Sequence, residues 1–171
     1  PEQLGKLLDE VFGDLPDKAA LAPVAKTDPI MGGRQTVVDM NVPQSVAVFG
    51  MGAMPRKDPD FIPAFVLNQI LGGGGFASKL MEEVREKRGL AYGVGSGLHT
   101  GDFSNSLIIG TSTRADRTQQ TLDVIRDVIR GMLEAGPTEA ELAAAKTYVI
   151  GAYPINNLDS SSAVARTLVE L

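Results

Sequence analysis

The sequence predicts an α+β fold, a two-layer sandwich in which helices cover one face of a mostly antiparallel sheet. Strand candidates occur in consecutive pairs, as they do in hairpins, and helix candidates also follow one another directly. Hydrophobic residues make up 43% of the 171 positions, which is enough to build a substantial core in one domain. The expected order is helix, two strands, two helices, two strands and three helices.

The N-terminal residues predict a helix and a linker. Apolar residues from Leu4 to Phe12 recur at helical spacing, and Gly13 is placed to end the helix. Prolines spread over residues 14–33 indicate an extended connection. We therefore expect residues 1–33 to be a helix and linker from a preceding region, and residues 34–171 to be the domain itself. Because the chain ends within an amphipathic pattern, we expect that domain to be truncated at its C-terminus.

Two strands and a helix are expected next. Residues 34–40 and 45–51 are rich in valine and phenylalanine, and a short segment containing Pro43 separates them. A helix should follow over residues 60–71. Asp60 can cap it, and Pro63 would lie in its first turn, where no backbone hydrogen bond is lost.

The second half predicts a helix, a hairpin and three further helices. The first helix covers about residues 78–88, and the hairpin strands cover about 90–99 and 104–111. Residues 117–134 form the clearest amphipathic helix, with one apolar stripe. The stripe consists of Leu122, Ile125, Ile129 and Met132, and Val128 lies beside it.

Helix caps mark the last two helices. Thr138 and Glu141 have the spacing of a capping box, which predicts a helix over about residues 139–151. Pro154 is expected to end or kink that helix. Asp159 or Ser160 can cap the final one.

Composition excludes several classes of function. The formal net charge is −5 and no block of basic residues occurs, so we expect no nucleic-acid partner. No apolar run approaches the ~18 residues that a membrane span requires. The chain has no cysteine and one histidine, His99, so neither thiolate zinc ligands nor an H-x-x-E-H motif is present.

Gly72, Gly73, Gly74 and Gly75 form a run that could suggest a phosphate loop. The Lys-hydroxyl pair that follows the last glycine of a P-loop is absent here. A loose dinucleotide pattern is satisfied, but it follows a helix candidate, and Tyr92 stands about where an acidic residue is needed. We therefore interpret the run as a helix cap followed by a flexible corner, where mobility or close backbone approach matters.

The charged residues of the predicted helix 78–88 divide into two groups. Glu82, Glu83 and Glu86 are expected on its solvated face. On an ideal helix at about 100° per residue, Arg88 falls within the apolar arc and Arg85 at its border. A partly buried arginine needs a partner. This pattern leaves open whether the arginines form internal pairs or bind an anion or carbonyl.

The segment LNQILGGGGFASKLMEEVREKRGLAYGVGSG resembles the signature of the C-terminal, zinc-free domain of pitrilysin/insulinase-type zinc metallopeptidases. That family includes mitochondrial processing peptidase, whose domains have the processing-peptidase-like (LuxS-like) form of the α+β sandwich. The likeness extends through the hairpin and the Thr138–Tyr153 helix with Lys146, and REKRGLAY is its most specific part.

The resemblance implies a role in peptide cleavage. Homologous domains enclose a chamber that admits a peptide or unfolded polypeptide, and one of them holds zinc through H-x-x-E-H. The opposite domain contributes an Arg/Tyr pair seven residues apart, which maps onto Arg85 and Tyr92. By this likeness, Arg85 and Tyr92 are catalytic and bind substrate, whereas Gly72, Gly73, Gly74 and Gly75 form a hinge or chamber loop.

The same likeness sets expectations for partners. We expect no metal in this chain, zinc in a separate domain or partner subunit, a dimer in the full-length protein, and no cleavage by this chain alone. A non-catalytic scaffold or assembly subunit is the alternative. The resemblance leaves bacterial cytoplasm and periplasm both open.

Overall fold

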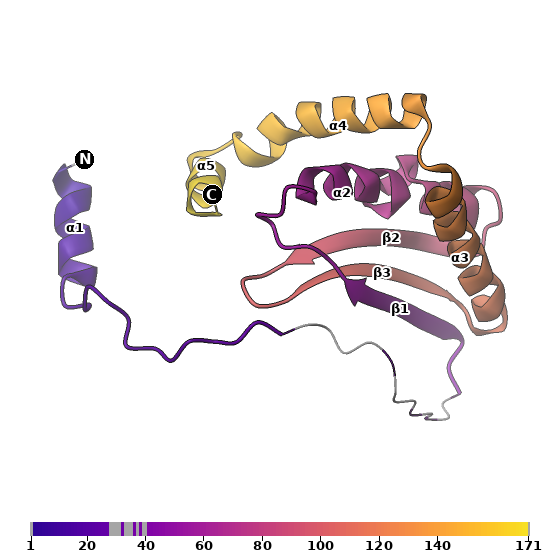
Figure 1. The fold of residues 1–171 in the computed structure, drawn as a ribbon, viewed down its shortest axis with the longest axis horizontal. Coiled ribbons are helices and arrows are strands. Elements are labelled where there is room, and N and C mark those ends of the chain that lie inside the picture. The colour runs from indigo at the N-terminus through magenta and orange to yellow at the C-terminus, as the bar shows by residue number, and fades with distance from the viewer. Residues whose placement is uncertain (1, 28–31, 33–35, 37, 39–40, 171) are drawn as a thin grey trace.

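The computed structural model describes residues 2–27, 32, 36, 38 and 41–170. Helices cover one face of a three-stranded sheet, and α1 lies apart from this body at the end of an extended segment (Figure 1). The predicted α+β class is therefore confirmed. Most of the strand candidate at residues 34–40 lies outside the described residues.

The sheet is antiparallel throughout, with the order β1-β3-β2. Its strands are β1 (Gln44–Gly52), β2 (Ala91–Thr100) and β3 (Asn105–Arg114). The predicted β2–β3 hairpin is confirmed, and β1 pairs with β3, so that β3 lies in the centre. In this sheet β2 therefore lies at an edge and pairs with β3.

The helical segments are more irregular than the sequence predicted. The α-helices are α1 (Glu2–Phe12), α2 (Phe61–Asn68), α3 (Thr118–Ala135), α4 (Glu139–Asn157) and α5 (Ser161–Glu170). Two π-helical segments are η1 (Gln69–Gly73) and η3 (Met81–Glu86). Two 3₁₀ turns are η2 (Gly75–Ala77) and η4 (Ala115–Arg117). The predicted helices 60–71 and 78–88 therefore both pass into π-helical geometry.

The core lies between the sheet and the helices. Leu80 and Val84, in and beside η3, are fully buried, and Ile125 of α3 is 1% exposed. They pack with Val94 of β2 and Ile109 of β3. Ile129 and Met132 of the predicted stripe, and Val128 beside it, border this core.

Two of the predicted helix caps are present, whereas one other cap and one predicted helix end differ from the structure. The Thr138–Glu141 capping box is present, and the Ser160 hydroxyl accepts a hydrogen bond from Ala163 N. Asp60 stands at the start of α2 without a side-chain cap bond. Pro154 lies inside α4, which continues to Asn157, so the predicted end near residue 151 was wrong. A proline near the end of a helix removes one hydrogen bond, and here the helix tolerates that loss.

Candidate functional site

Arg85 and Tyr92 lie together at the surface, where η3 passes into β2. The guanidinium carbon of Arg85 lies 4.6 Å from the centroid of the Tyr92 ring. The same carbon also lies 4.6 Å from the centroid of the Phe76 ring. The Arg85 side chain is 26% exposed, whereas Tyr92 is 85% exposed. The result is a cation held by two aromatic rings that remain open to solvent.

A π-helical turn sets the direction of Arg85. In η3 the backbone N–H of Lys87 donates to the carbonyl of Glu82, five residues back. Gly89 then takes a positive φ of 58°, which turns the chain from the helix into β2. Extra residues of this kind in a helix are common at functional sites, because they redirect one side chain without disturbing the helix on either side.

A β-bulge sets the direction of Tyr92. Ala91 is opposite Thr113 in β3 and Gly93 is opposite Ser112, so Tyr92 is an extra residue in its strand. The hydroxyl of Thr113 donates to the Leu90 carbonyl at 2.6 Å, which ties down the chain beside the bulge. Bulges re-aim side chains at the edges of sheets. Here the bulge directs Tyr92 away from the core toward Arg85.

Arg88, the other arginine of this region, forms an internal pair. Its Nη1 donates to the Glu83 carbonyl at 2.8 Å and also contacts the Glu83 carboxylate. The π-turn explains why the ideal α-helical projection placed Arg88 too close to the apolar arc: one additional residue per turn rotates later positions. The two arginines thus differ: Nη1 of Arg88 is bonded to Glu83, whereas Arg85 lies beside the Tyr92 ring and is paired through its Nε with Glu86 at 3.4 Å.

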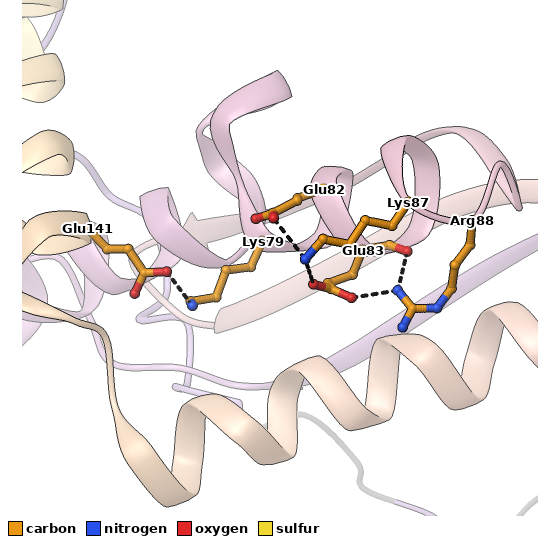
Figure 2. A network of polar contacts seen from close by, with 6 residues as sticks. All are labelled: Lys79, Glu82, Glu83, Lys87, Arg88 and Glu141. Carbon is orange, nitrogen blue, oxygen red and sulfur yellow. Dashed lines mark hydrogen bonds and ion pairs between the residues drawn. The ribbon is translucent and has the colours of Figure 1, made fainter.

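Charged side chains form a network on the side of η3 that faces α3 and α4 (Figure 2). Glu83 accepts hydrogen bonds from Lys87 and Arg88. The bond from Lys87 lowers the pKa of the Glu83 carboxyl most, and the bond from Arg88 lowers it next. The same contact with Glu83 raises the pKa of Lys87. The Glu83 carboxylate is thus shared between two cations of this network.

A separate ion pair joins the residues just before η3 to α4. Lys79 Nζ binds the carboxylate of Glu141, the residue that also completes the capping box of α4 (Figure 2). The hydrogen bond from Lys79 lowers the pKa of Glu141, and the bond from the Thr138 backbone contributes next. This pair fixes the start of α4 to the segment that follows the glycine run.

The four glycines are placed by packing and by backbone angle. A Cβ on Gly72 would lie 2.5 Å from Ser96 Oγ and 2.9 Å from Leu80 Cδ1, so the backbone approaches β2 closely there. A Cβ on Gly73 or Gly74 would meet Asn68 or Gln69 of the preceding turn. Gly75 has a φ of +57°. Close approach therefore accounts for Gly72, and the role of the run as a hinge or chamber loop stays a prediction.

Other candidate chemistry finds little support in the structure. Among the described residues, no group of three or more His, Cys, Asp and Glu side chains could hold a metal ion. His99 is exposed in β2. A cavity of about 420 Å³ lies between η3 and α3, lined by Glu83 and Arg88 among others, and Arg85 and Tyr92 lie outside its lining. No helix in the described part of the chain is both long and apolar enough to cross a membrane.

Comparison with known proteins gives one consistent result. Residues 1–149 match a family model described as the peptidase M16 inactive domain. A protein of Streptomyces coelicolor named as an uncharacterized zinc protease is 33% identical over 162 residues, covering 92% of this chain and 35% of its own length. A Helicobacter pylori protein named as a non-peptidase homolog is 30% identical over 95 residues, covering 56% of this chain and 22% of its own length.

Solved structures agree with the sequence relatives. A crystal structure of a peptidase M16 inactive domain from Pseudomonas fluorescens superposes with a TM-score of 0.72 at 32% identity. The match covers 88% of this chain and 36% of that one. The chain therefore spans about a third of the length of the relatives that it matches.

Proposed function

Since this chain belongs to the family of peptidase M16 inactive domains, we propose that it is the zinc-free, substrate-binding domain of a zinc-dependent metalloendopeptidase. In this proposal Arg85 and Tyr92 bind the peptide backbone at a closed chamber. The zinc belongs to a separate domain or partner subunit, and the full-length protein is a dimer. The observation that carries the proposal is the contact between Arg85 and the exposed ring of Tyr92.

The two side chains offer hydrogen-bond donors on one small surface. Within the described residues, Arg85 forms an ion pair through its Nε with Glu86 at 3.4 Å, and its Nη atoms form no hydrogen bond or ion pair. The Tyr92 hydroxyl is a donor on a ring that is largely in solvent. A peptide carbonyl can accept hydrogen bonds from both donors, because its oxygen has two lone pairs.

Hydrogen-bond donors of this kind can stabilise the transition state of the reaction as well as bind the substrate. When a peptide carbonyl is attacked, its oxygen gains negative charge, and a guanidinium and a phenol then bind it more strongly. Removal of one such donor raises the barrier by about 2.7–4 kcal/mol in comparable sites.

The described residues of this chain do not fit a zinc site. The metal, when bound in its own domain, would supply Lewis acidity and an activated water.

A scaffold or assembly subunit is the second candidate. It is favoured by the resemblance to the Helicobacter pylori protein that is named as a non-peptidase homolog. A scaffold has no need of free donors at the surface, whereas the π-turn and the bulge direct Arg85 and Tyr92 to the same place. The peptidase proposal accounts for that convergence.

The experiment compares two arginines of one segment in the protein that carries this domain together with its zinc-bearing domain or subunit. Arg85→Ala is expected to lower kcat/KM for a fluorogenic peptide roughly 100-fold or more, because a donor to the oxyanion is lost. Arg88→Ala is the matched control, because Arg88 is bonded to Glu83. The kcat/KM of the Arg88→Ala variant should change little. Equal effects of the two substitutions, or none from Arg85→Ala, would contradict the proposal.

A further inference from the structure

We propose that Phe76 is a positioning residue that holds the Arg85 guanidinium in a fixed orientation for a planar acceptor. The acceptor class is the backbone carbonyl or a carboxylate of a peptide. This inference rests on the function proposed above for Arg85 and Tyr92, and it adds a third residue, from the end of the glycine run, to that site.

The rings of Phe76 and Tyr92 lie at the same distance from the Arg85 guanidinium. Each ring centroid lies 4.6 Å from the guanidinium carbon of Arg85, well within the range of a cation–π interaction. Phe76 reaches this position from η2, which precedes η3, whereas Tyr92 comes from β2, which follows it. Arg85 is thus held by rings from both flanking segments of its own helix.

The position of Phe76 is not explained by burial. Its side chain is 68% exposed, so it contributes little to the core, whereas Leu80 and Val84 nearby are fully buried. An exposed phenylalanine gains little from the hydrophobic effect. Its cation–π contact with the Arg85 guanidinium is the side-chain interaction that the structure shows for it.

The backbone around Phe76 is restrained. Gly75, directly before it, has a φ of +57°, which turns the chain at this point. The hydroxyl of Ser78, which is completely buried, donates to the Gly75 carbonyl at 2.7 Å. Two fixed points therefore flank Phe76, so the ring is presented from a constrained turn although the side chain lies in solvent.

Stacking on aromatic faces leaves the edges of a guanidinium free. The N–H groups lie in the plane of the guanidinium and point outward, so rings above that plane do not compete with an acceptor. Holding the long arginine side chain before substrate arrives reduces the conformational entropy lost on binding. Phe76 would thereby strengthen the action of Arg85 without touching the substrate.

The test uses Phe76→Leu and Phe76→Tyr in the protein that carries its zinc-bearing domain or subunit, each in wild-type and Arg85→Ala backgrounds, with a fluorogenic peptide. Phe76→Leu removes the aromatic face and should lower kcat/KM roughly three- to tenfold. Phe76→Tyr keeps the aromatic face and should therefore retain most of the wild-type activity. The melting temperature should stay unchanged in both, because the side chain is 68% exposed.

The Arg85→Ala background distinguishes the possible roles. If Phe76 acts through Arg85, Phe76→Leu has no further effect once Arg85 is gone. An equal loss in both backgrounds would overturn the positioning role, since Phe76 would then act on the substrate itself. If Arg85→Ala lowers turnover and Phe76→Leu does not, Phe76 has no such role, although the proposed function stands. If Arg85→Ala has no effect, the proposed function and the role of Phe76 both fail.

Discussion

The guanidinium of Arg85 lies over the ring of Tyr92, with 4.6 Å between the guanidinium carbon and the ring centroid. The two residues are seven positions apart, and a helix, a positive-φ glycine and a bulge lie between them. The π-helical turn, the glycine and the bulge each redirect the chain between them. Their joint consequence is that two polar side chains of adjacent elements meet in solvent.

The first prediction concerns the core that supports this site. Ile125 is 1% exposed in α3 and packs against the buried residues of η3 and the sheet. Ile125→Ala should reduce the free energy of unfolding by about 2–5 kcal/mol in urea titrations of the purified domain. Leu133→Ala, on the same helix at 81% exposure, is the control and should change it by less than about 0.5 kcal/mol. Similar losses of unfolding free energy for both variants would contradict the assignment of Ile125 to the core.

The second prediction concerns the glycine run. A Cβ on Gly72 would lie 2.6 Å from the Ser96 backbone nitrogen, which cannot move without disturbing β2. Gly72→Ala should therefore destabilise the domain by about 1–3 kcal/mol. Gly110→Ala is the control, because a Cβ there meets nothing within 4 Å. A thermal melt of Gly72→Ala that matches the wild type would mean that the corner yields easily, as a mobile hinge would.

The third prediction concerns pH and the Lys79–Glu141 pair. The pKa of Glu141 is lower in the folded protein than its ordinary value, so the carboxylate stabilises the fold above its unfolded pKa. That contribution is lost as pH falls through the folded pKa. Glu141→Gln keeps a side chain able to complete the cap and removes the charge. The wild type should be more stable at pH 7 by up to about 1 kcal/mol, since the pair is partly exposed.

This difference should shrink as pH falls through the folded-state pKa of Glu141, because the wild-type carboxyl then becomes protonated and loses its charge. Urea unfolding of both proteins in a series of buffers from pH 7 downward measures it. Glu139→Gln, an exposed neighbour in the first turn of α4, controls for a general loss of negative charge near the helix start. A gap between the wild type and Glu141→Gln that stays constant as pH falls would contradict the assignment.

Regular elements could be predicted because their signals are local. The capping box of Thr138 and Glu141 and the β2–β3 hairpin follow from side-chain chemistry within a few residues. Pro154 shows the limit of such rules, since α4 continues past it. Whether a proline ends a helix depends on what the following residues gain from helical packing, and the local pattern does not contain that information.

The candidate site could be predicted only in part, because packing decides its geometry. The resemblance selected Arg85 and Tyr92, but the π-turn in η3 and the bulge at Tyr92 have no local signal. Both depend on how η3 packs on β2, where the Val94 N–H donates to the Met81 sulfur at 3.4 Å. Phe76 was missed for the same reason. Its position after Gly75 was visible, but its contact with Arg85 required the fold.

The central claim is that Tyr92 and Arg85 act together on a peptide carbonyl. Tyr92→Phe tests it most directly, because the ring that contacts Arg85 is kept and the hydroxyl alone is removed. Tyr153→Phe on α4 is the matched control, as another exposed tyrosine. Steady-state cleavage of a fluorogenic peptide should show kcat lowered roughly 100-fold for Tyr92→Phe and unchanged for Tyr153→Phe. Unchanged turnover by Tyr92→Phe would contradict the claim and favour a scaffold role for this domain.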